Sequence, residues 1–352
     1  MEYTKKEFGT MPDGRTAYLY TLENENGTIA QFTDLGAIWV SMQVRDKKGT
    51  LDDVVLGYDT FENYRLNPPH IGATVGRNAN RIANGTFEIN GVTYPLAINN
   101  GPNNLHSGPD YYDRRLWDAE ASEGTNGTQV SFSLSSPDGD QGFPGNAEIT
   151  VTYTLTPDDS VMIHYHMVCD QDTLANFTNH SYFNLAGQAS GDAMNQMAWI
   201  NADTFTPNDE FSIPTGEIRP VAGTPMDFTT MKTIGKDINE NYDQLVLGNG
   251  YDHNWVVNGW DGEVNLIAKA YDPVTGRAMD VYTDLPGVQF YTANFLTDEL
   301  PGKHGAVYGK RTAYCFETNY YPDAIHKPQF PSPVLKAGEE YDTTTIYHFY
   351  TE

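Results

Sequence analysis

Two side chains in this sequence could exchange protons with a bound molecule. His180 lies in the polar and aromatic segment 175–187, and histidine is the side chain best able to give and take protons near neutral pH. Glu317 follows the apolar run 313–316 and precedes a loop that contains a proline. A carboxylate in so hydrophobic a stretch is costly to bury unless it has a partner or a function. Both residues are therefore candidates for general acid–base chemistry.

Three loop segments could hold a ligand near these two residues. Asn80 and Arg81 lie in segment 76–85, and His106 ends a run rich in asparagine and glycine. Such side chains can donate to neutral hydroxyl groups without requiring a charged ligand. Asp252 lies between aromatic residues, an arrangement that suits a sugar because aromatic rings stack on its C–H face. Taken singly, each segment could also be an ordinary turn, and Arg81 could simply pair with a surface carboxylate.

No pattern in the sequence points to a metal or an organic cofactor. The glycine patterns match neither a phosphate-binding loop nor a dinucleotide fingerprint. Only Cys169 and Cys315 occur, far apart in the chain and without zinc-type spacing. We expect neither a metal nor a cofactor, and a reduced, cytoplasmic protein.

The charge balance narrows the range of partners. The 352 residues carry 47 acidic and 21 basic side chains, for a formal net charge of −26. Such a surface repels phosphate backbones and anionic lipid, so nucleic acid and membrane surfaces are not expected partners. We expect no signal peptide, because no apolar run follows the lysines near the N-terminus. No segment approaches the ~18 apolar residues that a membrane helix needs.

Alternating hydrophobicity predicts many short strands. Residues 148–156 and 161–168 alternate apolar and polar side chains, as half-buried strands do. Asn90-Gly91 predicts a type I′ hairpin turn between 87–89 and 92–94. Segments 279–283 and 288–295 look like another strand pair, and 227–238 could hold one short helix. Glycine and proline are spread evenly, without an interdomain linker. These features predict an all-β fold, a large antiparallel β-sandwich.

Six motifs follow one another along the chain. They are Gly76-Arg-Asn-Ala-Asn-Arg-Ile-Ala83, Asn104-Leu-His-Ser-Gly108, Thr178-Asn-His-Ser-Tyr-Phe-Asn-Leu-Ala-Gly187, Tyr251-Asp-His-Asn254, Gly287-Val-Gln-Phe-Tyr-Thr-Ala-Asn294 and Glu317-Thr318 followed by Pro322-Asp-Ala324. In this order they closely resemble the aldose 1-epimerase (galactose mutarotase) family. The resemblance runs from end to end, and the segments around His180 and Glu317 are its most specific parts.

The resemblance implies a fold and a set of functional residues. The fold would be a β-sandwich of the galactose mutarotase-like (supersandwich) type, with residues 1–352 forming a single domain. His180 would be the general acid and Glu317 the general base. The partner would be a small-molecule sugar, and the protein would be a monomer or a homodimer. The residues implied to surround the sugar hydroxyls are Asn80, Arg81, His106, Ser181, Tyr182, Asp252 and Gln289.

The implied reaction interconverts the α and β anomers of a free hexose such as galactose or glucose. Glu317 would remove the proton of the C1 hydroxyl while imidazolium His180 protonates the ring oxygen. A nearby carboxylate, Asp252 for example, is expected to favour the protonated form of His180. Two alternatives remain: a catalytically silent sugar-binding or regulatory protein on the same fold, and an epimerase of hexose 6-phosphates, which would need an added cluster of basic residues.

Overall fold

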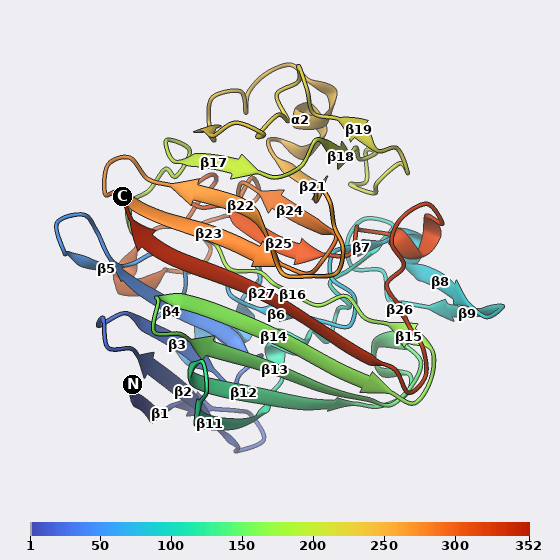
Figure 1. Ribbon diagram of the computed structural model, residues 1–352. Helices are drawn as coiled ribbons and strands as arrows, with labels where there is room; N and C mark the ends of the chain where they lie inside the picture. The colour runs from blue at the N-terminus through green and yellow to red at the C-terminus, as the bar shows by residue number, and fades with distance from the viewer. Residues whose placement is uncertain (1) are drawn as a thin grey trace.

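A nine-stranded antiparallel sheet forms the base of the fold in the computed structural model, which describes residues 2–352 (Figure 1). Long neighbouring strands near its middle pair over most of their length. Its strands in spatial order are β11 (Asp118–Gly124), β12 (Gly127–Ser136), β13 (Ala147–Leu155), β14 (Ser160–Cys169), β27 (Glu340–Thr351), β23 (Arg277–Thr283), β22 (Asn265–Tyr271), β17 (Met197–Ile200) and β20 (Lys232–Thr233).

Two five-stranded antiparallel sheets pack against the nine-stranded sheet, so the molecule is a large β-sandwich. The first has strands in chain order, and the second carries Asp252, Gln289 and Glu317. The first consists of β1 (Glu2–Thr10), β2 (Thr16–Glu23), β3 (Ile29–Thr33), β4 (Ile38–Arg45) and β5 (Leu51–Asp53). The second, in spatial order, consists of β19 (Arg219–Pro220), β18 (Thr204–Thr206), β21 (Asp252–Val256), β24 (Gly287–Tyr291) and β25 (Cys315–Asn319).

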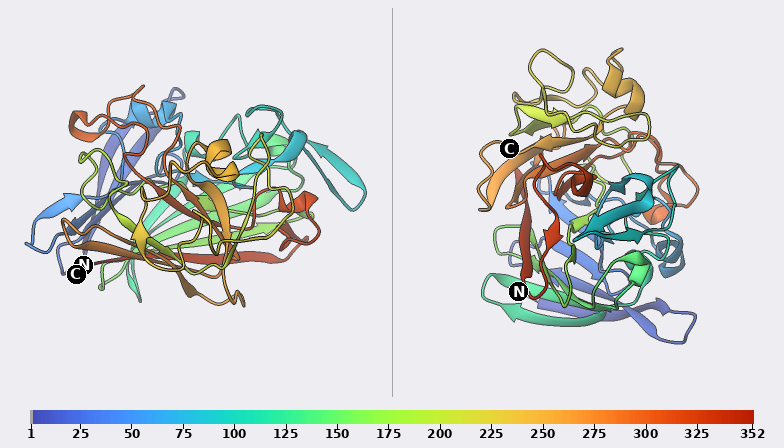
Figure 2. Two further views of the ribbon diagram at one scale, coloured as in Figure 1. Left: turned by 90° about the horizontal axis from the view of Figure 1, so that it is seen from above. Right: turned by 90° about the vertical axis from the view of Figure 1, so that its right-hand side faces the viewer.

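Short two-stranded ladders and brief helices complete the fold. The hairpin β8–β9 projects from one end of the molecule, as both Figure 1 and the left view of Figure 2 show. The ladders pair β6 (Thr74–Val75) with β16 (Thr178–Asn179), β7 (Arg81–Ile82) with β10 (Asn104–Leu105), β8 (Thr86–Ile89) with β9 (Val92–Pro95), and β15 (Thr173–Leu174) with β26 (Val334–Leu335). The helices are α1 (Phe61–Leu66) and α2 (Asp243–Gly248), with short 3-10 turns at 83–85, 112–114, 140–142, 303–305 and 324–326.

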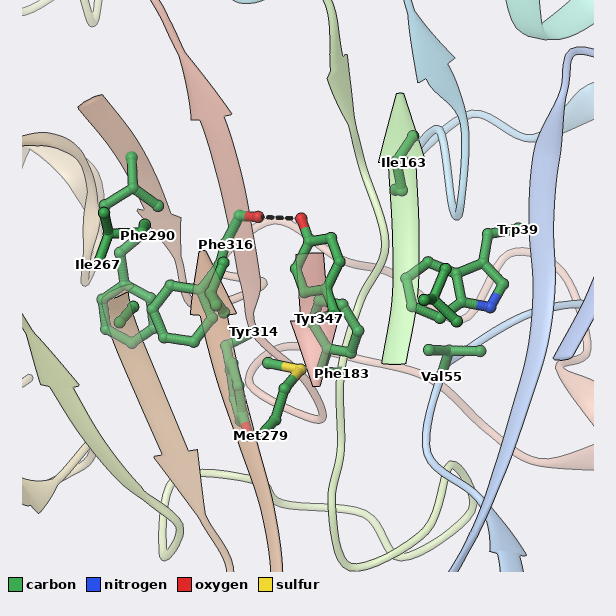
Figure 3. Close-up of a cluster of buried hydrophobic side chains, with 14 of the residues drawn as sticks. Trp39, Val55, Ile163, Phe183, Ile267, Met279, Phe290, Tyr314, Phe316 and Tyr347 are labelled. Atoms are coloured by element: carbon green, nitrogen blue, oxygen red, sulfur yellow. Dashed lines mark hydrogen bonds between the residues drawn. The ribbon is translucent and has the colours of Figure 1, made fainter. Parts of the chain in front are cut away.

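The core between the layers is rich in aromatic side chains (Figure 3). The ring of Trp39 in β4 lies 5.6 Å from that of Tyr347 in β27. The Tyr347 hydroxyl donates to the backbone carbonyl of Phe316 in β25, at 2.7 Å. Rings of Phe290 and Phe316, on neighbouring strands, stack 4.8 Å apart. Because aromatic side chains bury large apolar areas, this cluster fixes both five-stranded sheets on the nine-stranded sheet.

The strand predictions from alternation are confirmed. Strands β13 and β14 cover the segments expected and pair with each other, with Val151 opposite Tyr165. The hairpin β8–β9 turns at Asn90 and Gly91, whose φ angles are 53° and 76°. Positive φ at both central positions is what a type I′ turn requires.

Two expectations about local structure were wrong. Segments 279–283 and 288–295 do not pair: β23 belongs to the nine-stranded sheet, and β24 belongs to the second five-stranded sheet and ends at Tyr291. The chain instead crosses between the two layers at 284–286. Segment 227–238 contains no helix. Its buried side chains Phe228, Ile234 and Ile238 anchor an irregular loop to the core, so tertiary burial explains their spacing.

Within residues 2–352, no helix has both the length and the apolar character needed to cross a bilayer.

Candidate active site

Three adjacent strands of the second five-stranded sheet carry polar side chains on one face. Gln289 in β24 pairs with Glu317 in β25, and Tyr291 in β24 pairs with Asp252 in β21. Residues two apart on a strand share a face. The amide of Gln289 therefore reaches diagonally to Asp252 and donates to Oδ1 at 2.7 Å. Glu317 and Asp252 are thus presented on the same surface of the sheet.

Strand alternation explains why a carboxylate lies within so apolar a run. Phe316 points into the aromatic core, as Figure 3 shows, so its neighbours in β25 point to the opposite face. Glu317 is 4% exposed and Cys315 is fully buried. The apolar residues before Glu317 hold the strand in place, and the carboxylate faces the other way.

The ladder β7–β10 brings Asn80, Arg81 and His106 together. Arg81 pairs with Leu105, so the flanking residues Asn80 and His106 also lie opposite each other. The Asn80 N–H donates to His106 Nδ1 at 3.1 Å, and the His106 N–H donates to the Asn80 carbonyl at 3.0 Å. Arg81 Nε donates to the Asn100 side chain at 2.9 Å. Backbone pairing thus fixes the adjacent residues Asn80 and Arg81 beside His106, which lies 26 residues after Asn80.

His180 directly follows β16, whose ladder with β6 fixes its backbone. Its N–H donates to the Ala73 carbonyl at 2.9 Å, and its carbonyl accepts from the Gly72 N–H at 3.0 Å. Its ring is stacked on that of Tyr182, with centroids 5.0 Å apart. The ring of Tyr291 meets it edge-on at 6.2 Å. Backbone and aromatic contacts together leave the imidazole little freedom.

The two proton-transfer candidates lie beside each other. His180 Nε2 is 3.8 Å from Glu317 Oε2. The other ring nitrogen, Nδ1, is 3.6 Å from the Cys315 sulfur, within reach of a weak hydrogen bond. His106 also meets the His180 ring edge-on, with centroids 5.5 Å apart. One imidazole and one carboxylate therefore converge on a common point.

A cavity of about 480 Å³ opens above this pair. Its wall contains seven of the nine residues implied by the sequence, together with several aromatic and proline residues. Those seven are Asn80, Arg81, His106, His180, Tyr182, Asp252 and Glu317. Ser181 and Gln289 do not line it. Gln289 instead holds Asp252, and buried Ser181 follows the catalytic candidate His180 in the chain.

Burial governs the protonation of the pair. It raises the pKa of Glu317 well above the ordinary 4.5, with Asp252 adding to the rise and Arg81 opposing it. Burial, aided by His70, lowers the pKa of His180 from 6.5 to about 3. The expectation that a carboxylate such as Asp252 favours protonated His180 is therefore wrong for the free cavity. Desolvation of the imidazolium is the largest cause of this shift, so of the two groups Glu317 holds a proton more tightly than His180 does.

Burial also shifts the pKa values of the polar groups around the pair. The pKa of His106 lies well below 6.5, first because of burial and then because of the neighbouring His70 and His180. Burial likewise raises the pKa of Asp252, against the effects of Arg81 and Gln289. Burial thus disfavours the charged forms of His106 and Asp252, which suits a ligand that is itself uncharged.

Several residues of the cavity wall carried no signal in the sequence. His70, which follows two prolines, and Tyr111 lie outside the six motifs, and Tyr291 lies inside the motif 287–294 but resembles an ordinary core aromatic. Arg77, a motif residue, is fully buried away from the cavity, and its guanidinium donates to the carbonyls of Ser136, Pro144 and Gly145. That arginine is therefore a structural clamp, and not a partner for surface carboxylates.

One cluster within residues 2–352 has donor atoms close enough for a metal ion. Ligand atoms of His180, Cys315 and Glu317 all lie within 4.8 Å of one another. Burial, however, raises the pKa of the Cys315 thiol well above 9.0, and this side chain does not line the cavity. A metal needs the thiolate, so the chemistry of this donor set fits proton transfer better than metal binding.

Comparison with known proteins places this geometry in context. The family model described as Aldose 1-epimerase matches residues 18–348. Galactose mutarotase from Homo sapiens is 42% identical over 347 residues, which is 98% of each chain. Aldose 1-epimerase from Escherichia coli (strain K12) is 37% identical over 343 residues, 97% of each chain.

Solved structures agree with the sequence relatives. Galactose 1-epimerase from Lactobacillus acidophilus NCFM superimposes with a TM-score of 0.87 at 26% identity and covers 99% of each chain. The GalM/aldose epimerase homologue from C. elegans gives a TM-score of 0.85 at 30% identity, covering 94% of this chain and 98% of that one.

Proposed function

Because the chain belongs to the aldose 1-epimerase family, we propose that His180 and Glu317 interconvert the anomers of a free hexose such as galactose or glucose. Mutarotase activity, in the isomerase class, is that of its relatives along nearly their full length. One observation carries the assignment of residues: His180 Nε2 lies 3.8 Å from Glu317 Oε2, and both line one cavity. A pyranose presents its ring oxygen and C1 hydroxyl to these two groups.

The reaction requires two proton transfers and no net redox change. Glu317 as carboxylate takes the proton of the C1 hydroxyl, and His180 as imidazolium gives a proton to the ring oxygen. The C1–O5 bond breaks, leaving an aldehyde, and rotation about C1–C2 exposes the other face of the carbonyl. The transfers then reverse as the ring closes. Positioned transfers of this kind typically contribute about 10²–10⁴-fold each.

When a sugar is bound, His180 and Glu317 together carry one proton, as they do in the free cavity. In the free cavity the proton rests on Glu317, whose pKa is raised by burial. The hydroxyl at C1 donates to the Glu317 carboxylate, and the ring oxygen accepts from His180, so the sugar stabilises the form with the proton on His180. The nearby Arg81 also favours the carboxylate, because it lowers the pKa of Glu317. Sugar binding therefore favours imidazolium His180, the acid, and carboxylate Glu317, the base, at the same time.

The remaining wall of the cavity suits a neutral sugar. Arg81 and His106 supply donors, Asp252 accepts, and Asn80 can do both. Among the described residues that line the cavity, Arg81 is the one lysine or arginine. A phosphorylated hexose would lack the basic cluster it needs. We therefore favour a free sugar over a hexose 6-phosphate.

Polarimetry of freshly dissolved α-galactose tests the proposed activity. The protein should accelerate the approach to the equilibrium rotation in proportion to its concentration. Binding of galactose is measured in parallel by calorimetry. Binding without acceleration would identify a silent sugar-binding protein, and a preference for a hexose 6-phosphate would support the other alternative.

A further inference from the structure

A second imidazole–carboxylate pair lies in the cavity wall. His70 is 9% exposed and lines the cavity beside His106. Its Nδ1 lies 2.9 Å from Oδ2 of Asp113, which is 2% exposed. Edge-on contacts with Tyr111 at 4.5 Å and with His106 at 5.4 Å fix the plane of the ring. His70 is therefore held as firmly as the residues assigned to the reaction.

The hydrogen bonds determine what each of these two rings offers to a ligand. A carboxylate accepts, so His70 donates through Nδ1 to Asp113 and in its neutral form presents a lone pair at Nε2. His106 is arranged in the opposite way. Its Nδ1 accepts from the backbone N–H of Asn80, so its proton is at Nε2. One ring presents an acceptor and its neighbour presents a donor.

We propose that His70 is a specificity-determining residue that, together with His106, holds one hydroxyl of the sugar. His106 Nε2–H donates to the hydroxyl oxygen, and the hydroxyl proton is donated to His70 Nε2. A hydroxyl is the group that can satisfy both contacts at once. This inference rests on the proposed function, because it takes the ligand of the cavity to be a sugar.

The arrangement predicts how the protein distinguishes a hydroxyl from its closest substitutes. A fluorine at the same carbon can accept weakly from His106 but cannot donate to His70. A deoxy carbon satisfies neither ring. Because a site built to hydrogen-bond a hydroxyl is left with unpaired polar groups, both analogues should react less well. The contribution of His70 is measured as the difference in kcat/KM between the sugar with the hydroxyl and the sugar with fluorine at the same carbon.

The test is a comparison of wild type and His70→Phe on a panel of galactose analogues. The panel contains the 3-, 4- and 6-deoxy and the matching fluoro sugars, with kcat/KM measured by polarimetry. At one carbon, replacing the hydroxyl by fluorine should lower kcat/KM of the wild type by about three- to ten-fold. In His70→Phe that difference should vanish at the same carbon and remain unchanged at the others.

The controls separate this contact from a general loss of structure. His164→Phe changes another imidazole that is paired with an aspartate, at 3.0 Å from Asp342, outside the cavity wall; it should retain the wild-type pattern. Since His70→Phe leaves Asp113 buried without its donor, the double variant His70→Phe/Asp113→Asn is measured as well. It should show the same carbon-specific loss.

The outcomes are distinct from those that concern the proposed function. The hydroxyl contact is ruled out if the difference in kcat/KM between hydroxyl and fluorine changes equally at all carbons in both His70 variants. It is also ruled out if the difference stays as in the wild type at every carbon. If the wild type fails to accelerate mutarotation of galactose at all, the proposed function fails instead.

Discussion

At the scale of residues, the proposed chemistry depends on one imidazole and one carboxylate that share a proton. Both residues could be predicted from the sequence, because the six ordered motifs that include them resemble one family specifically. Their separation of 3.8 Å could not be predicted, nor could the burial that reverses the order of their pKa values. His70 was missed altogether, because a histidine after two prolines carries no pattern of its own. Its position became visible only from its contact with Asp113.

The pH profile should report the charges that surround Glu317. The active form of the His180–Glu317 pair carries one proton, so kcat/KM should depend on pH in a bell-shaped curve. Loss of that proton sets the alkaline side of the curve. Asp252 raises the pKa of Glu317, so Asp252→Asn should move the alkaline side to lower pH. Arg81 lowers the same pKa, so Arg81→Gln should move the alkaline side to higher pH.

These two shifts are measured from kcat/KM for galactose across the pH range, whatever the absolute loss of rate in each variant. Shifts in the same direction, or none in either variant, would contradict the placement of the proton on Glu317. A flat wild-type profile from about pH 5 to 9 would argue against the acid–base pair as a whole.

At the scale of elements, short ladders position the site. Alternation predicted β13, β14 and the hairpin β8–β9, because each has one buried face or a diagnostic turn. It could not predict that β23 and β24 belong to different sheets, since a short turn between two strands looks the same in sequence whether or not they pair. Nor could it predict two-residue strands such as β16, which nevertheless fixes the backbone at His180.

Gly72 tests the contribution of this local backbone. Its φ is +69°, its N–H donates to the His180 carbonyl, and a Cβ there would meet the Trp39 carbonyl oxygen at 2.1 Å. Gly72→Ala should therefore displace the strand before His180 and lower kcat. The overpacking should cost about 1–3 kcal/mol beyond the strain of the left-handed backbone, measured by denaturant unfolding.

Gly91→Ala is the matched control, because Gly91 has a φ of +76° but open space around its Cβ position. It should cost only about 1–2 kcal/mol of backbone strain and leave mutarotation unchanged. Equal losses of activity in the two variants would show that contact at Gly72 is not what holds His180.

At the scale of the whole molecule, a shared aromatic core joins all three large sheets. Trp39, Tyr347 and Phe316 come from three different sheets and belong to one buried cluster. We propose on this basis that residues 1–352 form a single domain. At this scale the composition predicts only which partners the charge of −26 disfavours, nucleic acid and membrane surfaces. It does not predict which sheets share a core.

A single domain predicts a single unfolding transition. Scanning calorimetry at neutral pH should give one peak whose calorimetric and van't Hoff enthalpies agree. Two resolved transitions would show that the first five-stranded sheet and the remainder of the chain unfold separately.

The central claim, that Glu317 acts as the base, is tested most directly by polarimetry of Glu317→Gln. Acceleration of galactose mutarotation should fall by about 10²–10⁴-fold, while Glu340→Gln, an exposed glutamate 3.6 Å from His166, should retain full activity. Burial raises the pKa of Glu317 above its ordinary 4.5, so its ionisation opposes folding increasingly as pH rises from that value toward the raised pKa. The glutamine variant should therefore unfold at a higher temperature than wild type at pH 7, which excludes misfolding as the cause of lost activity. Near-wild-type mutarotation by folded Glu317→Gln would contradict the account.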